Sequence, residues 1–304
     1  MALHLFLPIS DFIAKFALDG GKCVTIHSQN SMANDNTITR PELWTLILGL
    51  ESAKLQYILY TDAQSDSLIT GEVKLDLAGK TYLKAVEDAV YDTPLLLDDY
   101  KCVKVLYRAS HFVMLPREFA DNPDDAASAI EASLPESGGQ PCVCAMPQLE
   151  VCIAFEMPDD VANFLQRTFN NPSVFQHLYP LCRHFAGTCR DSGVTRMFVN
   201  FHSSAEMDVV VFDKTRLAFA NSFSFTSLAN AQYFILHIWH SLNLNVHTDE
   251  ILVIGDKYSR NAIMTSLRRY VSYVMPAIFP AAAMRLGDNA VAAPFELLTL
   301  ALCE

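Results

Sequence analysis

The sequence of 304 residues is short of positive charge and has no long apolar run. Lysine and arginine number 22 against 34 aspartate and glutamate residues, a formal net charge of -12. This balance repels the phosphate backbone, so we expect no nucleic-acid partner. No apolar run reaches the ~18 to 20 residues that cross a bilayer, so we expect no membrane partner and a soluble chain.

Paired cysteine motifs are also missing. The eight cysteines are scattered through apolar stretches of a large chain. Cys142 and Cys144 form a C-x-C, and His184 lies between Cys182 and Cys189, but no C-x-x-C pair of a structural zinc site is present. The pattern predicts buried thiols in a reducing compartment, with no metal site and no cofactor.

The apolar N-terminus, MALHLFLPISDFIAKFAL, lacks the basic segment with which a signal peptide begins. Pro8 and Asp11 interrupt its apolar part, and no small-residue cleavage site follows. We therefore predict a cytoplasmic location. Residues 1–40 are expected to be an N-terminal extension, with two short β-like runs around Asp19-Gly20-Gly21 and a polar connector.

The rest of the chain repeats one plan, in which three strands are followed by a helix and another strand. In the first half an acidic loop over 121–140 interrupts the plan and is a candidate partner-docking insertion, with a short helix in its first part. The first half is expected to contain strands near 43–50, 54–61, 67–76, 101–107, 110–115 and 149–156, and helices near 80–91, 158–169 and 174–186.

The second half is expected to contain strands near 196–202, 207–212, 216–225 and 250–255, and helices near 227–243 and 259–273. A β-β-β-α-β order that occurs twice without repeated letters predicts duplicated α/β domains rather than a solenoid. The apolar tail PFELLTLALCE is expected to pack back on a domain.

Several ordered segments resemble an uncharacterised bacterial family of unknown function that has an actin-like ATPase, ribonuclease H-like, fold. They are LILGLESAKLQYILY, SLITGEVKLDL, CVKVLYRASHFVMLPREF, MDVVVFDKTRLAFANSFSF, YFILHIWHSL, EILVIGD and PFELLTLALC. The resemblance covers residues 42–304. It implies two actin-like domains of mixed sheet, over 41–190 with an inserted subdomain and over 191–304 with a C-terminal tail.

Active members of that superfamily need a first phosphate loop, in which a strand ends in D-x-G and a lysine follows on the returning strand. The aspartate positions a metal-bound water, and the glycine lets the backbone approach phosphate. Gly49 and Lys54 fit the glycine and the lysine. Ile47 and Leu50 stand where the acid and a hydroxyl residue are expected.

The other two motifs that the resemblance implies are also incomplete. In the second phosphate loop the expected acid falls on Asn200 or Phe201, and the expected glycine falls on His202 or Ser203. The adenosine motif, normally a strand that ends in two glycines, keeps only Gly255, and Asp256 places a carboxylate beside any phosphate. Nucleotide binding is therefore doubtful.

The leading hypothesis is a non-catalytic interaction or scaffold module with an unknown protein partner. Gly49, Lys54 and Gly255 would then line a vestigial nucleotide-binding cleft. The alternative is an ATPase-like protein with divergent phosphate loops, in which acids such as Asp256 hold a metal ion. A third hypothesis is an adaptor of a membrane-associated assembly.

Other candidate residues favour structural roles. His237 and His240 share a helix face and either bind a metal or a carboxylate, or belong to a packed aromatic helix. His202 precedes Ser203 and Ser204, but no G-x-S-x-G elbow of a hydrolase exists.

Two further groups of charged side chains lie outside these motifs. Asp208 and Asp213 flank an apolar strand and are interpreted as solvated strand ends. Arg260, Arg268 and Arg269 make the last clear helix basic, and this helix is the first place to look for anion binding.

Overall fold

The computed structural model describes residues 38–133, 138–190 and 193–303, without the side chain of residue 123. The expected N-terminal hairpin falls outside these residues. From residue 38 onward the chain forms one compact unit that contains two five-stranded sheets. The domain boundaries at 40/41 and 190/191 stay a prediction.

The first sheet has the strand order β3-β2-β1-β4-β8. Strand β1 (Thr45–Leu50) pairs in antiparallel fashion with β2 (Lys54–Tyr60) and in parallel with β4 (Cys102–Tyr107). Strands β3 (Ile69–Lys74) and β8 (Ser173–Gln176) form the two edges. The sheet is therefore mixed, as predicted.

The second sheet repeats this topology with the order β11-β10-β9-β12-β13. Its first three strands form an antiparallel meander, and β12 and β13 add in parallel. The strands are β9 (Arg196–Phe201), β10 (Glu206–Asp213), β11 (Arg216–Ser224), β12 (Glu250–Gly255) and β13 (Tyr273–Pro276). The predicted duplication of a β-β-β-α-β unit is confirmed.

Helices cover the outer face of each sheet. Helices α1 (Tyr82–Tyr91) and α3 (Asp159–Thr168) pack on the first sheet, where Leu46 and Leu48 of β1 are completely buried. Helices α5 (Leu228–Ser241) and α6 (Lys257–Leu267) pack on the second sheet. Buried alternate positions on the strands and apolar stripes on the helices account for these two cores.

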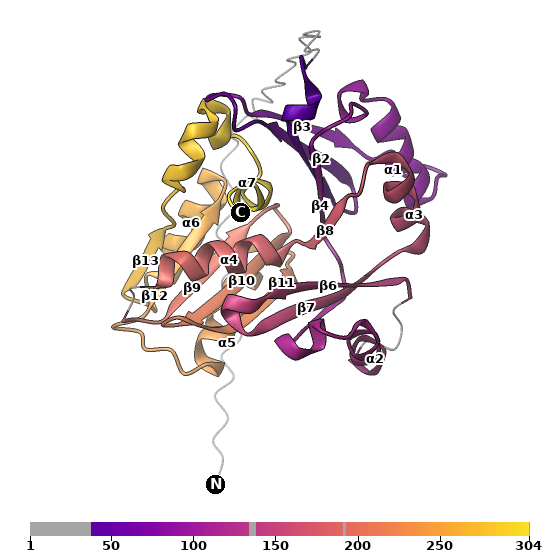
Figure 1. Ribbon diagram of the computed structural model, residues 1–304. Helices are drawn as coiled ribbons and strands as arrows, with labels where there is room; N and C mark the ends of the chain where they lie inside the picture. The colour runs from indigo at the N-terminus through magenta and orange to yellow at the C-terminus, as the bar shows by residue number, and fades with distance from the viewer. Residues whose placement is uncertain (1–37, 134–137, 191–192, 304) are drawn as a thin grey trace. The chain divides into compact units, whose positions relative to one another are not determined.

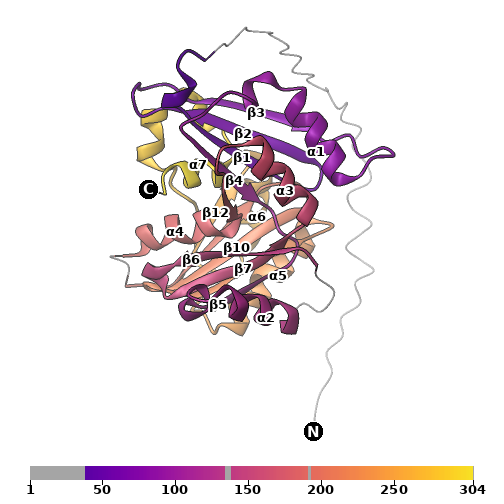
Figure 2. The ribbon, with the colours of Figure 1, turned by 45° about the vertical axis from the view of Figure 1, so that its right-hand side comes forward.

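Two further helices, α4 (Leu178–Cys189) and α7 (Phe295–Ala301), lie between the sheets (Figures 1 and 2). They pack against each other, and α7 also contacts β1 and β2. The core around them joins Ile47 of the first sheet to Phe198 of the second. The apolar tail therefore packs back as expected and connects the two halves of the molecule.

A small subdomain is inserted between β4 and α3. Its three-stranded sheet has the order β5-β7-β6, and one helix packs on the buried Ala154 of that sheet. The elements are β5 (Phe112–Pro116), α2 (Pro123–Ser133), β6 (Gln140–Met146) and β7 (Val151–Met157). The short helix expected in the first part of the acidic loop is thus α2, and β6 was not predicted.

Two predicted helices were wrong in part. The start of the expected helix over 174–186 is strand β8, because Val174 and Phe175 extend the first sheet beside β4. The expected helix over 259–273 ends at Leu267, and Tyr273 begins β13 beside β12. In both places pairing with a distant strand outweighs local helix propensity. Among the described residues, no helix is long and apolar enough to cross a membrane.

Candidate functional site

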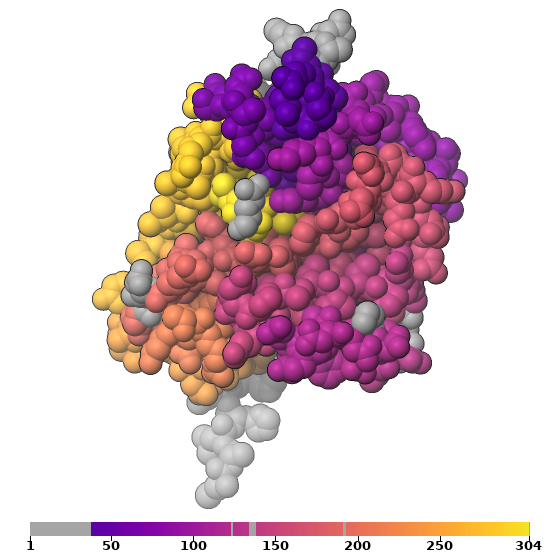
Figure 3. Space-filling view, viewed as in Figure 1, coloured from indigo at the N-terminus to yellow at the C-terminus, as the bar shows by residue number. Residues whose placement is uncertain are grey.

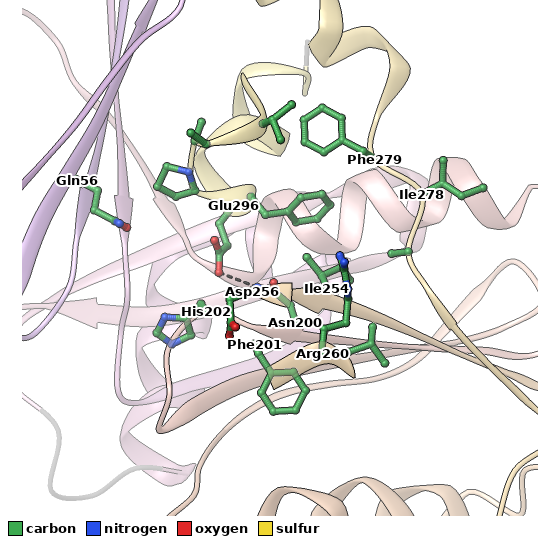
Figure 4. Close-up of a pocket in the computed structure, with 18 of the residues that line it drawn as sticks. Gln56, Asn200, Phe201, His202, Ile254, Asp256, Arg260, Ile278, Phe279 and Glu296 are labelled. Atoms are coloured by element: carbon green, nitrogen blue, oxygen red, sulfur yellow. Dashed lines mark hydrogen bonds between the residues drawn. The ribbon is translucent and has the colours of Figure 1, made fainter. Parts of the chain in front are cut away.

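A cavity of about 630 Å³ lies where β9 and β12 end and α6 begins. Residues 277–279 and 291–296 complete its wall, and the β1–β2 hairpin contributes Glu51 and Gln56 (Figure 4). Strands β9 and β12 are parallel, and ligands of open α/β sheets commonly bind beyond the carboxyl ends of such strands. This cavity is therefore the candidate functional site.

Gly255 lies in the wall of this cavity, at the end of β12. Its φ angle is 128°, and a Cβ atom placed there would lie 2.7 Å from the carbonyl oxygen of Phe201. Only glycine combines this backbone conformation with such a close approach of β12 to β9. The residue thus has a structural reason to be glycine, whether or not a ligand binds.

Asp256 follows and caps α6. Its Oδ1 accepts hydrogen bonds from the backbone N–H groups of Tyr258, at 2.8 Å, and Ser259, at 3.1 Å. Hydrogen bonds from Ser259 and these N–H groups lower the pKa of Asp256. The donors that a helix N-terminus offers to a phosphate are therefore already bonded to a carboxylate of the chain itself.

Lys54 and Gly49 do not line this cavity. Nζ of Lys54 lies 3.2 Å from Oε2 of Glu72 and 3.7 Å from Oε1 of Glu51, and the residue lines a separate cavity of about 500 Å³. A Cβ atom on Gly49 would lie 3.0 Å from Cδ2 of Leu297, so α7 fills the space beside this glycine. The three predicted residues thus face different surroundings, and their role in nucleotide binding stays a prediction.

A buried ionic network lies next to the cavity and joins the two sheets through α7. Arg108, which follows β4, donates two parallel hydrogen bonds to the carboxylate of Asp208 on β10, at 3.0 and 3.1 Å. Its Nη2 also donates to Oε1 of Glu296 on α7, at 3.3 Å. The side chains of Arg108, Asp208 and Glu296 are 14%, 0% and 9% exposed, so water competes little for these bonds.

Asn200 of β9 completes this network. Its amide donates to Oε1 of Glu296 at 2.7 Å, the dashed bond in Figure 4, and to Oδ2 of Asp208 at 3.4 Å. Burial alone would raise the pKa of Asp208, but Arg108 and His177 outweigh it and hold this pKa well below its usual range. Asp208 is therefore an ionised carboxylate whose oxygens are all bonded within the protein.

Known families and solved structures identify the relatives of this chain. A family described as protein of unknown function (DUF3822) matches residues 33–274, most of the chain. The chain belongs to the DUF3822 family. No curated protein matches it.

Solved structures show the fold of this DUF3822 chain. A Bacteroides thetaiotaomicron VPI-5482 protein, described as having an actin-like ATPase fold and unknown function, is 19% identical with a TM-score of 0.74. The match covers 88% of this chain and 99% of that chain. A chain of a PilM-PilN type IV pilus biogenesis complex is 11% identical with a TM-score of 0.52, over 86% and 98% of the two chains. The DUF3822 chain therefore has the actin-like ATPase fold that its sequence predicts.

His177 and Ser222 meet beside the network in an arrangement that the sequence did not reveal. Oε1 of Gln176 accepts from the Leu178 N–H, which turns the Gln176 amide nitrogen toward Nδ1 of His177 at 3.0 Å. Nδ1 is therefore the acceptor, and the protonated Nε2 donates to Oγ of Ser222 at 2.7 Å. Ser222 in turn donates to Oδ1 of Asp208 at 2.8 Å.

This tautomer makes His177 a donor to the serine, not a base toward it. Burial, followed by the nearby charge of Arg108, lowers the pKa of His177 and keeps the imidazole neutral. A serine nucleophile needs a histidine nitrogen that is free to take its proton. The DUF3822 chain thus lacks hydrolase geometry at Ser222.

The fit of a metal–nucleotide group to this DUF3822 chain is poor. Ile47, in the expected acid position of the first loop, is completely buried in the core around α4 and α7. Asn200 is neutral, and the two acids nearest to it are bonded to Arg108. Across the described ranges, no three His, Cys, Asp or Glu side chains are grouped as metal ligands. The residues that the structure describes thus supply no carboxylate cradle for Mg²⁺ at this site.

Asp208 corrects one interpretation made from the sequence. It is not a solvated strand end, because β10 runs from Glu206 to Asp213 and buries Asp208 completely. Its partner Arg108 lies 100 positions away, so no local spacing could reveal the pair. The same holds for Glu296, which is 188 positions from Arg108.

The remaining candidates are exposed or have structural partners. His237 and His240 are exposed on α5 and line a surface depression, where His237 stacks on Tyr233. Arg268 donates two hydrogen bonds to the carbonyl oxygen of Val274. The seven cysteines among the described residues are all free thiols.

Proposed function

We propose that this protein is a nucleotide-independent member of the actin-like fold that acts as an interaction or scaffold module. The observation that carries the proposal is the buried network of Arg108, Asp208 and Glu296. A guanidinium of the chain holds both carboxylates beside the candidate cavity.

The energetics of the network support this proposal. An Mg²⁺ ion recruits carboxylates that are free to bind it or its water shell. Asp208 would have to leave Arg108 first, and breaking a buried ion pair costs about 3 to 5 kcal/mol. The cap of α6 by Asp256 and the contact of Leu297 with Gly49 act in the same direction.

One of the similar structures supports the proposal that this protein binds another protein. A chain of this fold occurs in the PilM-PilN type IV pilus biogenesis complex, so the fold is found in a protein assembly. We extend only the mode of action, association with another protein, to the present chain. A cytoplasmic location is part of the proposal, because free thiols in all seven described cysteines suit a reducing compartment.

Calorimetric titration with ATP, with and without Mg²⁺, tests the proposal. We expect no saturable binding of nucleotide at concentrations up to about 1 mM. A protein that binds nucleotide tightly would show a Kd in the micromolar range, a binding free energy of about -8 kcal/mol. Phosphate release should equal that of a Lys54→Ala variant. Tight Mg²⁺-dependent binding, or turnover that Lys54→Ala abolishes and Lys74→Ala leaves intact, would contradict the proposal.

The second candidate is an ATPase-like protein with divergent phosphate loops. The cavity of about 630 Å³ beside Gly255 favours it, since the volume suits a small ligand. Nucleotide that copurifies with the protein and is released on denaturation would support this candidate over the first.

A further inference from the structure

The carboxylates that line the 630 Å³ cavity already have partners. Glu296 accepts hydrogen bonds from Arg108 and Asn200, and Asp256 accepts those of α6. Glu51 lies 3.7 Å from Nζ of Lys54. An incoming ligand therefore has no free acid in this wall to neutralise.

Two other side chains in the same wall do have unused bonding capacity. Nε of Arg260 is buried without a hydrogen-bond partner, although the charge of this guanidinium helps to lower the pKa of Asp256. Nδ1 of His202 has no hydrogen-bond partner, and this side chain is only 4% exposed. Nε2 of His202 lies 3.0 Å from Oε2 of Glu206. With Nε2 of His202 facing a carboxylate, Nδ1 of this ring is left as an acceptor. Buried polar atoms are nearly always bonded, so the free Nε–H of Arg260 points to a ligand with acceptor atoms.

The rest of the wall is apolar and in part open to solvent. Phe279 and Phe295 are half-buried, whereas Ile278 and Val291 are 87% and 65% exposed. Figure 4 places Ile278 and Phe279 together on the side of the cavity where Arg260 lies, away from Gln56. A ligand there would cover exposed apolar surface and face one guanidinium.

We propose that this cavity binds a small monocarboxylic acid with an aromatic or aliphatic body. The carboxylate pairs with the guanidinium of Arg260, and the body packs against Phe279, Phe295 and Ile278. Arg260 is the one arginine in the wall, which also contains Glu51, Asp256 and Glu296. A group with a single negative charge is balanced by Arg260, whereas a phosphate chain carries several charges against this one guanidinium. This inference does not depend on the proposed function.

Titration of the full chain with 3-phenylpropanoate and octanoate tests the site. Each acid should bind with a saturable isotherm, and 3-phenylpropylamine, the matched cation, should bind at least about 10-fold more weakly, as the loss of one charge-assisted pair requires. The inference would be overturned if neither acid binds at concentrations up to about 10 mM, or if the amine binds as tightly as the acids.

Matched variants locate the site. Arg260→Met keeps the aliphatic stem and should raise the Kd of both acids by about 10-fold or more. Arg269→Met, just beyond the end of α6 and outside the wall, should change the Kd by less than about 2-fold. Ile278→Glu changes a side chain that is 87% exposed, so folding is preserved, and its charge should weaken binding of the acids. Unchanged affinity in Arg260→Met and Ile278→Glu would refute the site.

Magnesium ATP serves as the last arm of the experiment. ATP that competes with the acids at lower concentration would overturn both this inference and the proposed function. Binding of the acids without competition by ATP supports the inference, and it leaves the proposed function to its own titration.

Discussion

At the scale of the residue, burial sets the roles of the charged side chains. Arg108 and Asp208 form a two-bond ion pair from which water is almost excluded, whereas Arg216 and Asp213 lie 3.7 Å apart with side chains 78% and 48% exposed. In the first pair, removal of one partner would leave the other charge buried and unpaired, which is strongly destabilising. The second is a surface pair of small energetic value.

Arg108→Met should therefore lower the free energy of unfolding by about 3 to 5 kcal/mol, because it leaves the Asp208 carboxylate buried and unpaired. Arg216→Met, the surface control, should lower it by less than about 1 kcal/mol. Urea unfolding at neutral pH measures both. Adding Asp208→Asn to Arg108→Met should restore part of the loss, and a double variant no more stable than the single one would count against the pairing argument.

His184 gives the stability a defined pH dependence. Burial lowers its pKa to about 4, and its ring packs edge-on against Phe185 and Phe295. The unfolded chain, with a His pKa near about 6.5, binds the proton more tightly, so stability falls as pH drops from about 6.5 toward 4. At pH 5 the loss should be about 2 kcal/mol.

Urea unfolding at pH 7 and pH 5 measures this loss. His184→Phe should show a smaller difference between the two pH values than the unchanged chain. An equal difference in both would mean that His184 is not the group responsible. His177, whose pKa burial also lowers, acts in the same direction and should account for part of the remainder.

At the scale of the element, short-range signals mark where three of the described helices begin. The side chain of Thr81 caps α1 through the N–H of Lys84, and Ser227 caps α5 through the N–H of Asn230. Asp256 caps α6 in the same way at the edge of the candidate cavity. These residues precede their helices directly, so a sequence pattern is able to find them.

Asp256→Ala should lower the free energy of unfolding by about 1 kcal/mol, the usual value of an N-cap. Asp256→Asn, which keeps an acceptor oxygen, should stay within about 0.5 kcal/mol of the unchanged chain. Denaturant unfolding compares the two variants. A loss of equal size in both would show that charge at this position, rather than capping, stabilises α6.

Local signals failed where a segment takes its structure from a distant neighbour. Strand β8 pairs with β4, which precedes it by more than 60 residues, and β13 is held beside β12. Strand β6 is different, because it pairs in antiparallel fashion with β7, the next strand in the chain. Strands β8 and β13 are stabilised by partners that the sequence leaves unspecified.

At the scale of the whole molecule, α4 and α7 make one core out of two sheets. Figure 3 shows the yellow C-terminal segment between the indigo part of the first sheet and the salmon-coloured α4. Leu298 and Leu300 of α7 are buried in the core that also contains Ile47 and Phe198. The halves of the chain should therefore unfold together.

The two tryptophans allow a direct test, because Trp44 is half-buried against the core of the first sheet and Trp239 is buried in that of the second. Trp44→Phe and Trp239→Phe each leave one fluorescent probe. In each variant we expect the fluorescence and circular dichroism midpoints of unfolding to coincide. After correction for the stability of each variant, both should show the same cooperativity of unfolding.

Leu298→Ala should weaken the coupling of the two sheets. It removes a completely buried side chain from α7 and should lower stability by about 2 to 5 kcal/mol, with separate midpoints for the two probes. Separate midpoints in the unchanged core would mean that the two sheets fold as independent domains.

The sequence by itself determined the strand–helix repeat and the apolar central strands, because periodicity and residue type are local properties. Only the tertiary structure decided that Arg108 reaches Asp208, that Leu297 covers Gly49 and that Nε of Arg260 is buried without a hydrogen bond in the cavity wall. Such contacts join residues far apart in the chain, and their energy comes from burial, which exists only once the fold has formed.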